Sequence, residues 1–445
     1  MKLLSMVMLS ALPLTAAFAQ SPFLGVQNGP RKGMQSAIMN PAEIASLTKK
    51  VEAHVFSAQA VVSNNVLNFQ NIIDESDLLD FALENADGPI NLRTEAAVLG
   101  PSVGFSVGKW GFGIASQGFV KADIIDLDAG IADGLFGDSG NTWQSGSQTF
   151  TGLSSSNNQR ILAAGWAELD LLLGREILAV GRHHFAGGAN FRLIFPSLYT
   201  NLGLGQFRGT IVEDEQGIYL TDASAEFNIA YSDAALNEDF SYNLGSLGGF
   251  SLDLGGTYQW KKSDGSSFIH AGLAVKNLGS MSFSNNSTSQ SYAMNIPASE
   301  QFRIDNLEGD LEDIEAQLVN SGYFAIDRGS EGLSINLPTM VNIYGEIRPA
   351  KAFQASLFVQ RRLSDEANNN VITAQNMIVL TPRLVLGSFQ IYSPWAHSQV
   401  SGLTGGLGLQ LGGFFIGSNA ILTGTLANSM QADFHMGFSF GVGKK

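Results

Sequence analysis

The chain contains no cysteine among its 445 residues, so it has neither a disulfide framework nor a cysteine for lipid attachment. Charged residues make up only 15% of the sequence, and the net charge of −15 argues against nucleic acid as a partner, because phosphate binding needs a basic surface. After the N-terminal region no stretch is long and apolar enough for a transmembrane helix, so any membrane insertion must use strands. No Pro-rich or Ser-rich linker divides the chain.

The one apolar run lies at the N-terminus and is typical of a secretory signal. Lys2 precedes the apolar residues 3–14, and Ala17 and Ala19 form a small-x-small cleavage site. The alternative is a membrane anchor, but the run is too short to span a bilayer as a helix. We therefore expect residues 1–19 to be a cleaved signal peptide.

The sequence is rich in glycine and phenylalanine, with 50 Gly and 29 Phe, and it alternates apolar and polar residues. Near the C-terminus, Phe434, Met436 and Phe438 alternate with Asp433 and His435. A secreted, Gly-rich chain whose strands are apolar on one face and polar on the other is typical of a transmembrane β-barrel. The same alternation would occur in a soluble sandwich with its apolar face in the core. The signal peptide and the turn lengths favour the membrane barrel.

The predicted strands are separated alternately by tight turns and by long polar segments, which is the asymmetry of an outer-membrane barrel. The spacing predicts about fourteen strands, at 51–62, 94–107, 110–122, 159–176, 184–195, 247–261, 267–283, 337–348, 352–362, 374–386, 389–395, 400–411, 414–420 and 431–442. Residues 205–232 leave room for an extra hairpin within a loop. We predict an all-β fold, an up-and-down antiparallel transmembrane β-barrel over residues 51–445. It would lie in the outer membrane of a Gram-negative bacterium, with periplasmic termini and extracellular long loops.

Two segments do not have the pattern of strands. Residues 20–50 contain Asn40, Pro41, Ala42 and Glu43, and Asn at the cap, Pro at the first helical position and Glu at the third are a helix-start signal. We predict a short helix from Pro41 to about Thr48 within a hatch or plug over residues 20–50, with a frayed periplasmic tail as the alternative. A second segment, 303–320, has apolar residues at helical spacing and predicts an amphipathic helix that caps the barrel mouth.

Asn40-Pro41-Ala42 before a fourteen-strand barrel resembles the fatty-acid transporter (FadL-like) superfamily, in which the N-terminal segment is a hatch. More closely, the chain resembles a family of uncharacterised outer-membrane barrels, a domain of unknown function, from Bacteroidota. The motifs that carry this resemblance are 164–169, 252–255, 337–339, 381–383, 401–406, 415–418 and 431–433.

The resemblance implies one of two functions. Related barrels either pass hydrophobic molecules or are accessory barrels in protein secretion. The chain departs from the pattern at its end, which is Gly441 to Lys445 and not a terminal aromatic residue. Insertion by the barrel-assembly machinery is still expected, through the region of Phe438 and Phe440.

Alternation also predicts which polar side chains face the lumen, and these are Arg160, Glu168, Asp170, Asn190, Arg192, Asp253, His270, Lys276, Asn342, Tyr344, Glu346, Arg348, Arg383, Asp433 and His435. Some could form a ligand or selectivity site, as charged rings do in pores. Glu168, Asp170, Arg348 and Arg383 are the first candidates. The alternative is a set of paired charges that fills a narrow barrel, because buried charges persist best when they are paired.

No motif for catalysis or for a cofactor is present. The sequence has no nucleophile elbow and no His-Glu-x-x-His, so we expect neither enzymatic activity nor a cofactor. Two acidic clusters in predicted loops, at 74–80 and 305–315, could attract divalent cations, but they lack the spacing of a calcium loop and are better read as solvated faces; no metal site is predicted. We expect passive transport of a small, hydrophobic molecule, or a non-transporting scaffold of a secretion or envelope complex. The predicted partners are outer-membrane lipid, the barrel-assembly machinery and proteins of such a complex.

Overall fold

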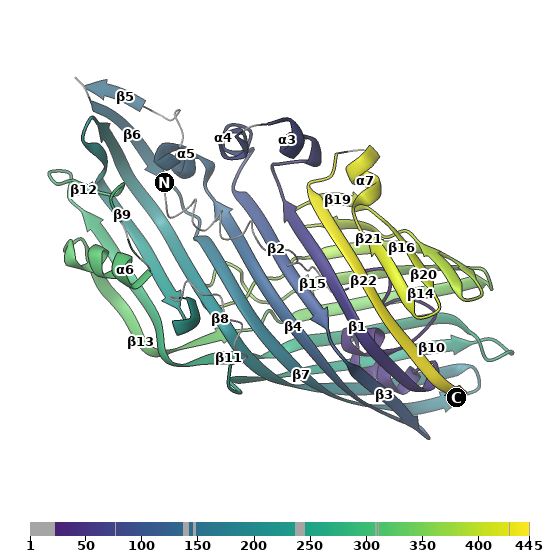
Figure 1. Ribbon diagram of the computed structural model, residues 1–445. Helices are drawn as coiled ribbons and strands as arrows, with labels where there is room; N and C mark the ends of the chain where they lie inside the picture. Colours follow the sequence, from purple (N-terminus) through teal and green to yellow (C-terminus); the bar gives the residue numbers. More distant parts are fainter. Residues whose placement is uncertain are drawn as a thin grey trace.

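The strands form one antiparallel sheet that closes on itself (Figure 1). The computed structural model describes residues 23–75, 77–136, 142–145, 148–235, 245–307, 309, 311–426 and 428–444. The predicted signal peptide, residues 1–19, lies outside the described residues, as do residues 20–22 of the predicted hatch. The ring closes where β1 (Lys49–Asn64) pairs with β22 (Gln431–Lys444), from Lys49 opposite Lys444 to Ser63 opposite Gln431.

The ring has fourteen positions, which confirms the predicted barrel. Three positions are each occupied by two strands separated by a short break. In order around the ring the strands are β1, β2 (Ile90–Leu99) with β3 (Ser102–Val107), β4 (Trp110–Leu127), β7 (Gln159–Val180), β8 (His183–Asp214), β10 (Gly249–Lys261), β11 (Ser267–Ile296), β14 (Met340–Ala350), β15 (Phe353–Arg362), β16 (Met377–Leu386), β17 (Phe389–Tyr392) with β18 (Trp395–Ser398), β19 (Gly402–Gly405) with β20 (Leu407–Leu411), β21 (Phe414–Ser418) and β22.

Two ring strands are far longer than a bilayer requires. β8 has 32 residues and β11 has 30, whereas about 9–11 residues suffice to cross a bilayer. Their distal halves pair with β9 (Gly217–Tyr231), and β11 also pairs with β13 (Phe324–Asn336). Together they form a sheet extension on the side of the long loops (Figure 1). Smaller strands are β5 (Thr142–Ser145), β6 (Gln148–Ser154) and β12 (Phe302–Arg303).

The strand ends predicted near residues 195 and 283 are wrong, because both strands continue into the sheet extension, to Asp214 and Ile296. The segments beyond those points are more polar, so the sequence pattern reads as loop, but in the structure they pair with each other and satisfy their backbone groups. The extra hairpin expected within 205–232 is confirmed as the β8–β9 hairpin.

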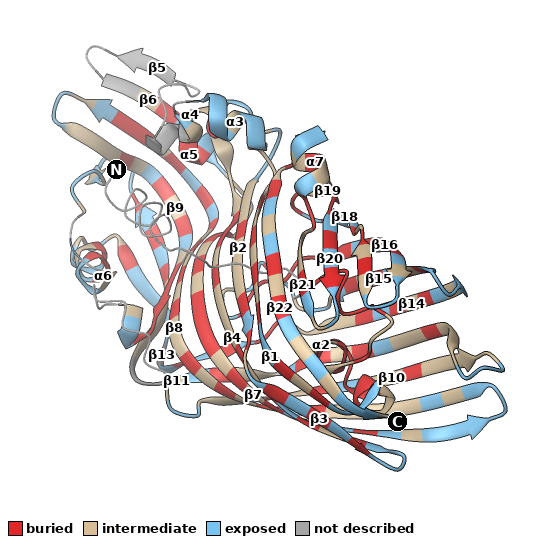
Figure 2. Cartoon of the chain, turned by 45° about the vertical axis from the view of Figure 1, so that its right-hand side comes forward, coloured by how far each residue is buried: buried red, intermediate tan, exposed pale blue. Residues whose placement is uncertain are grey.

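The two faces of the ring differ in polarity. Along the strands, buried and exposed residues alternate, so that one face is apolar and exposed and the other is buried (Figure 2). The exposed large apolar side chains of the ring include Phe105, Ile114, Leu171, Phe191, Leu254, Leu273, Leu357, Leu380, Leu409, Phe434, Phe438 and Phe440.

Within the described part of the chain, no helix is both long enough and apolar enough to cross a membrane.

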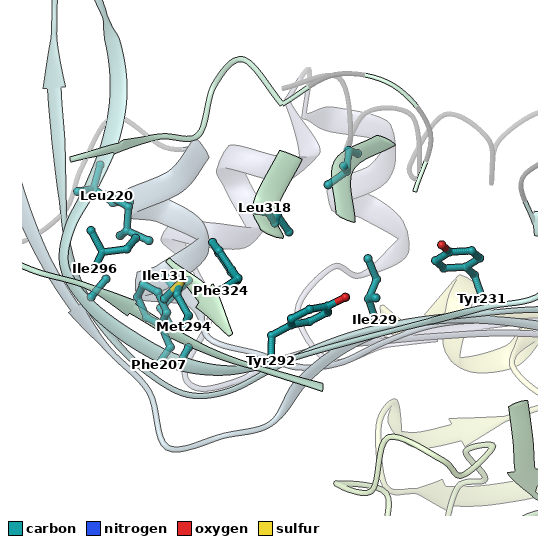
Figure 3. Close-up of a cluster of buried hydrophobic side chains, with 14 residues drawn as sticks. Ile131, Phe207, Leu220, Ile229, Tyr231, Tyr292, Met294, Ile296, Leu318 and Phe324 are labelled. Carbon is teal, nitrogen blue, oxygen red and sulfur yellow. The ribbon is translucent and has the colours of Figure 1, made fainter. Parts of the chain in front are cut away.

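Short helices lie at the long-loop end of the barrel, and one covers the sheet extension (Figure 1). They are α3 (Phe69–Asp74), α4 (Leu78–Glu84), α5 (Ala129–Phe136), η2 (Asp233–Ala235), α6 (Leu311–Asn320) and α7 (Ile421–Leu426). Leu318 of α6 packs in an apolar cluster with Tyr292, Phe324 and Ile296 of the extension (Figure 3). The helix predicted over 303–320 therefore starts later, because the backbone around residue 303 pairs with β9 instead.

Candidate functional site

The N-terminal segment, residues 23–48, lies inside the ring. It contains α2 (Met34–Met39), which the sequence did not predict, and the 3-10 helix η1 (Pro41–Ser46). Asn40 caps η1, since its side chain accepts a hydrogen bond from the backbone N–H of Ala42 at 3.0 Å. Its amide also donates to the carbonyl of Gly256 at 3.1 Å, so the cap residue binds the wall as well. We call residues 23–48 the hatch.

A row of glycines forms the seat of the hatch. The register pairs glycines across four neighbouring strands, β4, β7, β8 and β10, at Gly111, Gly174, Gly188 and Gly255. A Cβ at Gly111 would overlap the carbonyl of Ile44, and a Cβ at Gly188 would overlap the carbonyl of Pro41. The backbone of η1 therefore lies directly on the backbone of the wall, an approach that only glycine permits.

A charged network joins the hatch to β11 and β14, the strands that follow the seat in the ring. Glu43, fully buried, lies 2.8 Å from Nε2 of His270 and 3.7 Å from Nζ of Lys32, and it accepts a hydrogen bond from the hydroxyl of Tyr344. Lys32 also forms an ion pair with Glu346. Buried charges are tolerated when they are paired and hydrogen-bonded. The hatch and the wall thus each supply charges that the other neutralises.

The start of the hatch is held from another side of the ring. Arg383, buried, donates to the carbonyl of Gly25 and to the side chain of Gln390 at 2.9 Å. Its guanidinium lies 4.7 Å from the ring centroid of Tyr392. Phe23 packs edge-on against Phe415, with ring centroids 6.1 Å apart. Both charge and aromatic contacts fix the first residues of the hatch.

Deeper in the lumen, one arginine holds three carboxylates. Arg192 lies 3.2 Å from Glu168 and 3.2 Å from Asp170, and it pairs with Asp253. Gln117 adds a hydrogen bond to Asp170 at 2.7 Å. The candidates Glu168 and Asp170 are therefore brought together, but as partners of Arg192.

A loop from the opposite end also enters the ring. Residues 363–376, between β15 and β16, place their backbone carbonyls around Arg160. The guanidinium of Arg160 donates hydrogen bonds to the carbonyls of Glu366, Asn369 and Val371. The carboxylate of Glu366 pairs with Arg93. We call residues 363–376 the inward loop. Only its length marks this loop in the sequence, because its many Asn residues are equally typical of a surface loop.

Between the hatch and the inward loop is a cavity of about 70 Å³. Ile38 and Met39 of the hatch and Ala374 and Gln375 of the inward loop are among its lining residues. The wall contributes Gln117, Lys121, Trp166, Glu168, Arg192, Lys276 and Asn342, among others. The cavity therefore lies where the two inserted segments meet.

The four predicted candidates do not form one site. Glu168 and Asp170 lie with Arg192, whereas Arg383 holds the start of the hatch. Arg348 lies near the tight turn between β14 and β15 and donates to the carbonyl of Lys351 at 3.0 Å. Of the other side chains predicted to face the lumen, all are buried except Asp433, which is half-buried.

The acidic clusters do not form a metal site in the part of the chain that is described. No group of three or more His, Asp or Glu side chains there could hold a metal ion. Asp305 pairs with Arg303 at 2.7 Å, and Glu315 accepts hydrogen bonds from the hydroxyls of Tyr231 and Tyr292. Glu308 and Asp310 lie outside the described residues.

Comparison with known proteins gives one family and several distant structures. The profile of a family of unknown function, DUF5723, matches residues 41–419. No curated protein matches the chain significantly. A TodX monoaromatic hydrocarbon channel with the deltaS2S3 mutation is 8% identical, with 92% of each chain covered and a TM-score of 0.44. The Pseudomonas putida toluene transporter TodX is 8% identical (93% of this chain, 95% of that chain, TM-score 0.41). A Pseudomonas aeruginosa FadL homologue is also 8% identical (96% and 98%, TM-score 0.31).

Proposed function

Since the chain belongs to DUF5723, a family of unknown function, we propose its role from its own geometry. It is a barrel of the outer membrane that passes a small molecule when the hatch leaves its seat. The hydrophobic nature of that molecule, and an origin in Bacteroidota, stay predictions from the resemblance.

One observation carries this proposal: the hatch is a separate segment that rests on a smooth, glycine-lined surface of the wall. Covalent continuity with the ring exists only after residue 48, where β1 begins. The contacts of the hatch are hydrogen bonds, ion pairs and side-chain packing, which can be exchanged for water or for a ligand. A barrel of this size with the hatch moved aside would keep a polar lumen, as channels do.

The test uses the absence of cysteine from the chain. The side chains of Ser46 and Gln259 are joined by a hydrogen bond of 3.0 Å between hatch and wall. We would replace both with cysteine, join them with a short cross-linker that forms a reducible disulfide with each thiol, and measure conductance in planar lipid bilayers. We expect openings before cross-linking and their loss afterwards, with recovery when the cross-link is reduced.

Two controls complete the experiment. Each single-cysteine variant, treated with the same reagent, should keep its openings. A variant lacking residues 20–48 should conduct continuously. If that deletion variant folds as a barrel but does not conduct, the transport proposal is wrong.

The second candidate function is a scaffold for an envelope or secretion complex. The sheet extension favours it, because β8, β9, β11 and β13 hold a large folded surface away from the ring (Figure 1). The lumen crowded with paired charges also fits a barrel that transports nothing. The lipid of the outer membrane, the barrel-assembly machinery acting through Phe438 and Phe440, and proteins of such a complex are the proposed partners.

Purification in mild detergent from native outer membranes, followed by mass spectrometry of retained protein and lipid, distinguishes the two functions. A partner protein in fixed stoichiometry without a small ligand supports the scaffold. A solitary barrel with a bound small molecule supports transport.

A further inference from the structure

The cavity between the hatch and the inward loop contains a lysine that has no hydrogen-bond or ion-pair partner among the described residues. Lys276 lines this cavity and is only 8% exposed. Within the described ranges of the chain, no hydrogen bond or ion pair reaches its ammonium group. An unpaired ammonium group is costly to bury. Other buried basic side chains of the lumen, such as Lys32 and Arg192, are paired.

The backbone fixes this arrangement. At Asp253 the register between β10 and β11 shifts, so that the consecutive residues Lys276 and Asn277 are both buried. Asn277 has a positive φ of 61° and donates its backbone N–H to Asp253 at 2.8 Å. β-bulges redirect side chains, and residues with such backbone strain cluster at functional sites. The bulge also uses one oxygen of Asp253, and Arg192 uses the other, so this carboxylate is occupied.

Unpaired acceptors line the same cavity. The side-chain oxygens of Asn342 and Gln375 have no hydrogen-bond partner among the described residues. A bound molecule would therefore meet a donor at Lys276 and acceptors at Asn342 and Gln375. Ile38 and Met39 of the hatch give the cavity an apolar side.

Charge and volume narrow the class of ligand. Around Arg192 the lumen holds three carboxylates, those of Glu168, Asp170 and Asp253, and two cations, those of Arg192 and Lys276. Negative charge is therefore already in excess there, and a simple anion would add to it. A zwitterion offers a carboxylate to Lys276 without changing the net charge. The cavity of about 70 Å³ has room for roughly five water-sized groups, at about 10–15 Å³ each.

We propose that this cavity binds a small zwitterion of the amino-acid type, with its carboxylate on Lys276 and its ammonium group toward Asn342 and Gln375. The inference rests on the proposed function, since it names the substrate class of the same lumen. It also departs from the hydrophobic molecule that the sequence resemblance implies. Binding places the ligand against the hatch, so occupancy and hatch position would be coupled.

The test measures binding of glycine and alanine to the intact chain in detergent, by saturation-transfer NMR after overnight incubation. We compare the unaltered chain with Lys276→Met and with Lys50→Met, which alters an exposed lysine. We expect the affinity for glycine to fall at least tenfold in Lys276→Met and to be unchanged in Lys50→Met. Heat-modifiable migration on gels checks that each variant is folded.

A second variant keeps the lysine and fills the cavity. Ala374→Leu adds volume from the inward loop and should abolish glycine binding if Lys276→Met does not fold. If acetate bound as tightly as glycine, the proposal that the ligand is a zwitterion would be wrong. If neither bound, the cavity would hold water only. These outcomes do not depend on conductance, so failure here is separable from failure of the transport proposal.

Discussion

Arg192 allows three carboxylates to remain together inside the barrel. It contacts Glu168, Asp170 and Asp253 on the two strands beside its own, β7 and β10. Without Arg192, the three carboxylates would be buried next to one another. They would lose the attraction to its positive charge, which offsets the cost of removing them from water.

We predict that Arg192→Met lowers the free energy of unfolding by about 3–5 kcal/mol, the usual effect of breaking a buried pair. Chemical unfolding from lipid vesicles would measure this change. Arg303→Met is the matched control, because the pair with Asp305 is exposed and should contribute about 0–1 kcal/mol. Equal effects of the two substitutions would contradict the view that Arg192 neutralises this layer. Adding Asp253→Asn to Arg192→Met should restore part of the stability.

Substitution of a single glycine tests whether the hatch is held by its close approach to the wall. Gly111→Ala puts a methyl group where the carbonyl of Ile44 lies, so we predict that the hatch is displaced. Faster proteolysis of the N-terminal segment and frequent openings in bilayers should follow. Gly118→Ala on the same strand is the control, since a Cβ there has open space. A hatch that stays protected in Gly111→Ala would mean that it is not held by this close approach.

Among the elements, α6 is held on the sheet extension by both apolar packing and one carboxylate. Ile314 and Leu318 pack into the apolar cluster, and Glu315 accepts from the hydroxyls of Tyr231 and Tyr292. Hydrogen bonds to a charged group contribute about 1.5–3 kcal/mol. A specific polar contact thus adds to the apolar packing that holds the helix on the extension.

We predict that Glu315→Leu loosens α6, with faster hydrogen exchange of residues 311–320 than in the exposed control Glu312→Gln. No difference between these variants would show that packing alone holds the helix.

The docking of α6 should also depend on pH. Burial, with the carboxylate of Glu315 nearby, raises the pKa of Tyr231 to about 12, against about 10 in an unfolded chain. The protonated hydroxyl is the donor, so its stabilising effect is fully present below pH 10 and is lost as the pH rises toward 12. Hydrogen exchange corrected for intrinsic rates would reveal this loss. If α6 loosened on acidification from neutral pH instead, with no change between pH 10 and 12, the assignment of Tyr231 as donor would be wrong.

At the scale of the whole molecule, the exposed apolar face of the ring indicates a lipid-facing surface. We predict that Leu357→Arg, in the middle of β15, lowers stability in a bilayer by about 2–4 kcal/mol. Val180→Arg, beside a tight turn, should lower it by about 0–1 kcal/mol, since the effect falls toward the interface. Equal stability of both variants and the unaltered chain would argue against membrane insertion of this face.

The ring could be predicted well from the sequence because each strand shows its own alternation of apolar and polar residues. Residues 414–418 and 431–442, for example, lie in β21 and β22 as expected. The helix start at Asn40 was readable because its signal is local. That Arg192 would hold Glu168, Asp170 and Asp253 was not readable, since it depends on register across three strands.

Other features could not be predicted because their sequences are ambiguous. Polar residues beyond position 196 suit both a loop and a strand outside a membrane, and only pairing with β9 decides between them. The sequence of the inward loop is ambiguous in the same way. Asn369 would be equally stable in solvent, and the loop is held inside the ring by contacts with Arg160 and Tyr199, which lie in distant strands.

The sheet extension determines which surface of the protein is presented outside the cell in the proposed orientation. In the proposed orientation, the outermost part of the molecule is a hydrogen-bonded wall formed by β8, β9, β11 and β13. An antibody or a bacteriophage would then have to recognise a surface assembled from segments far apart in the chain. Peptides copied from a single strand would compete poorly for such a binder, and denaturation would abolish recognition.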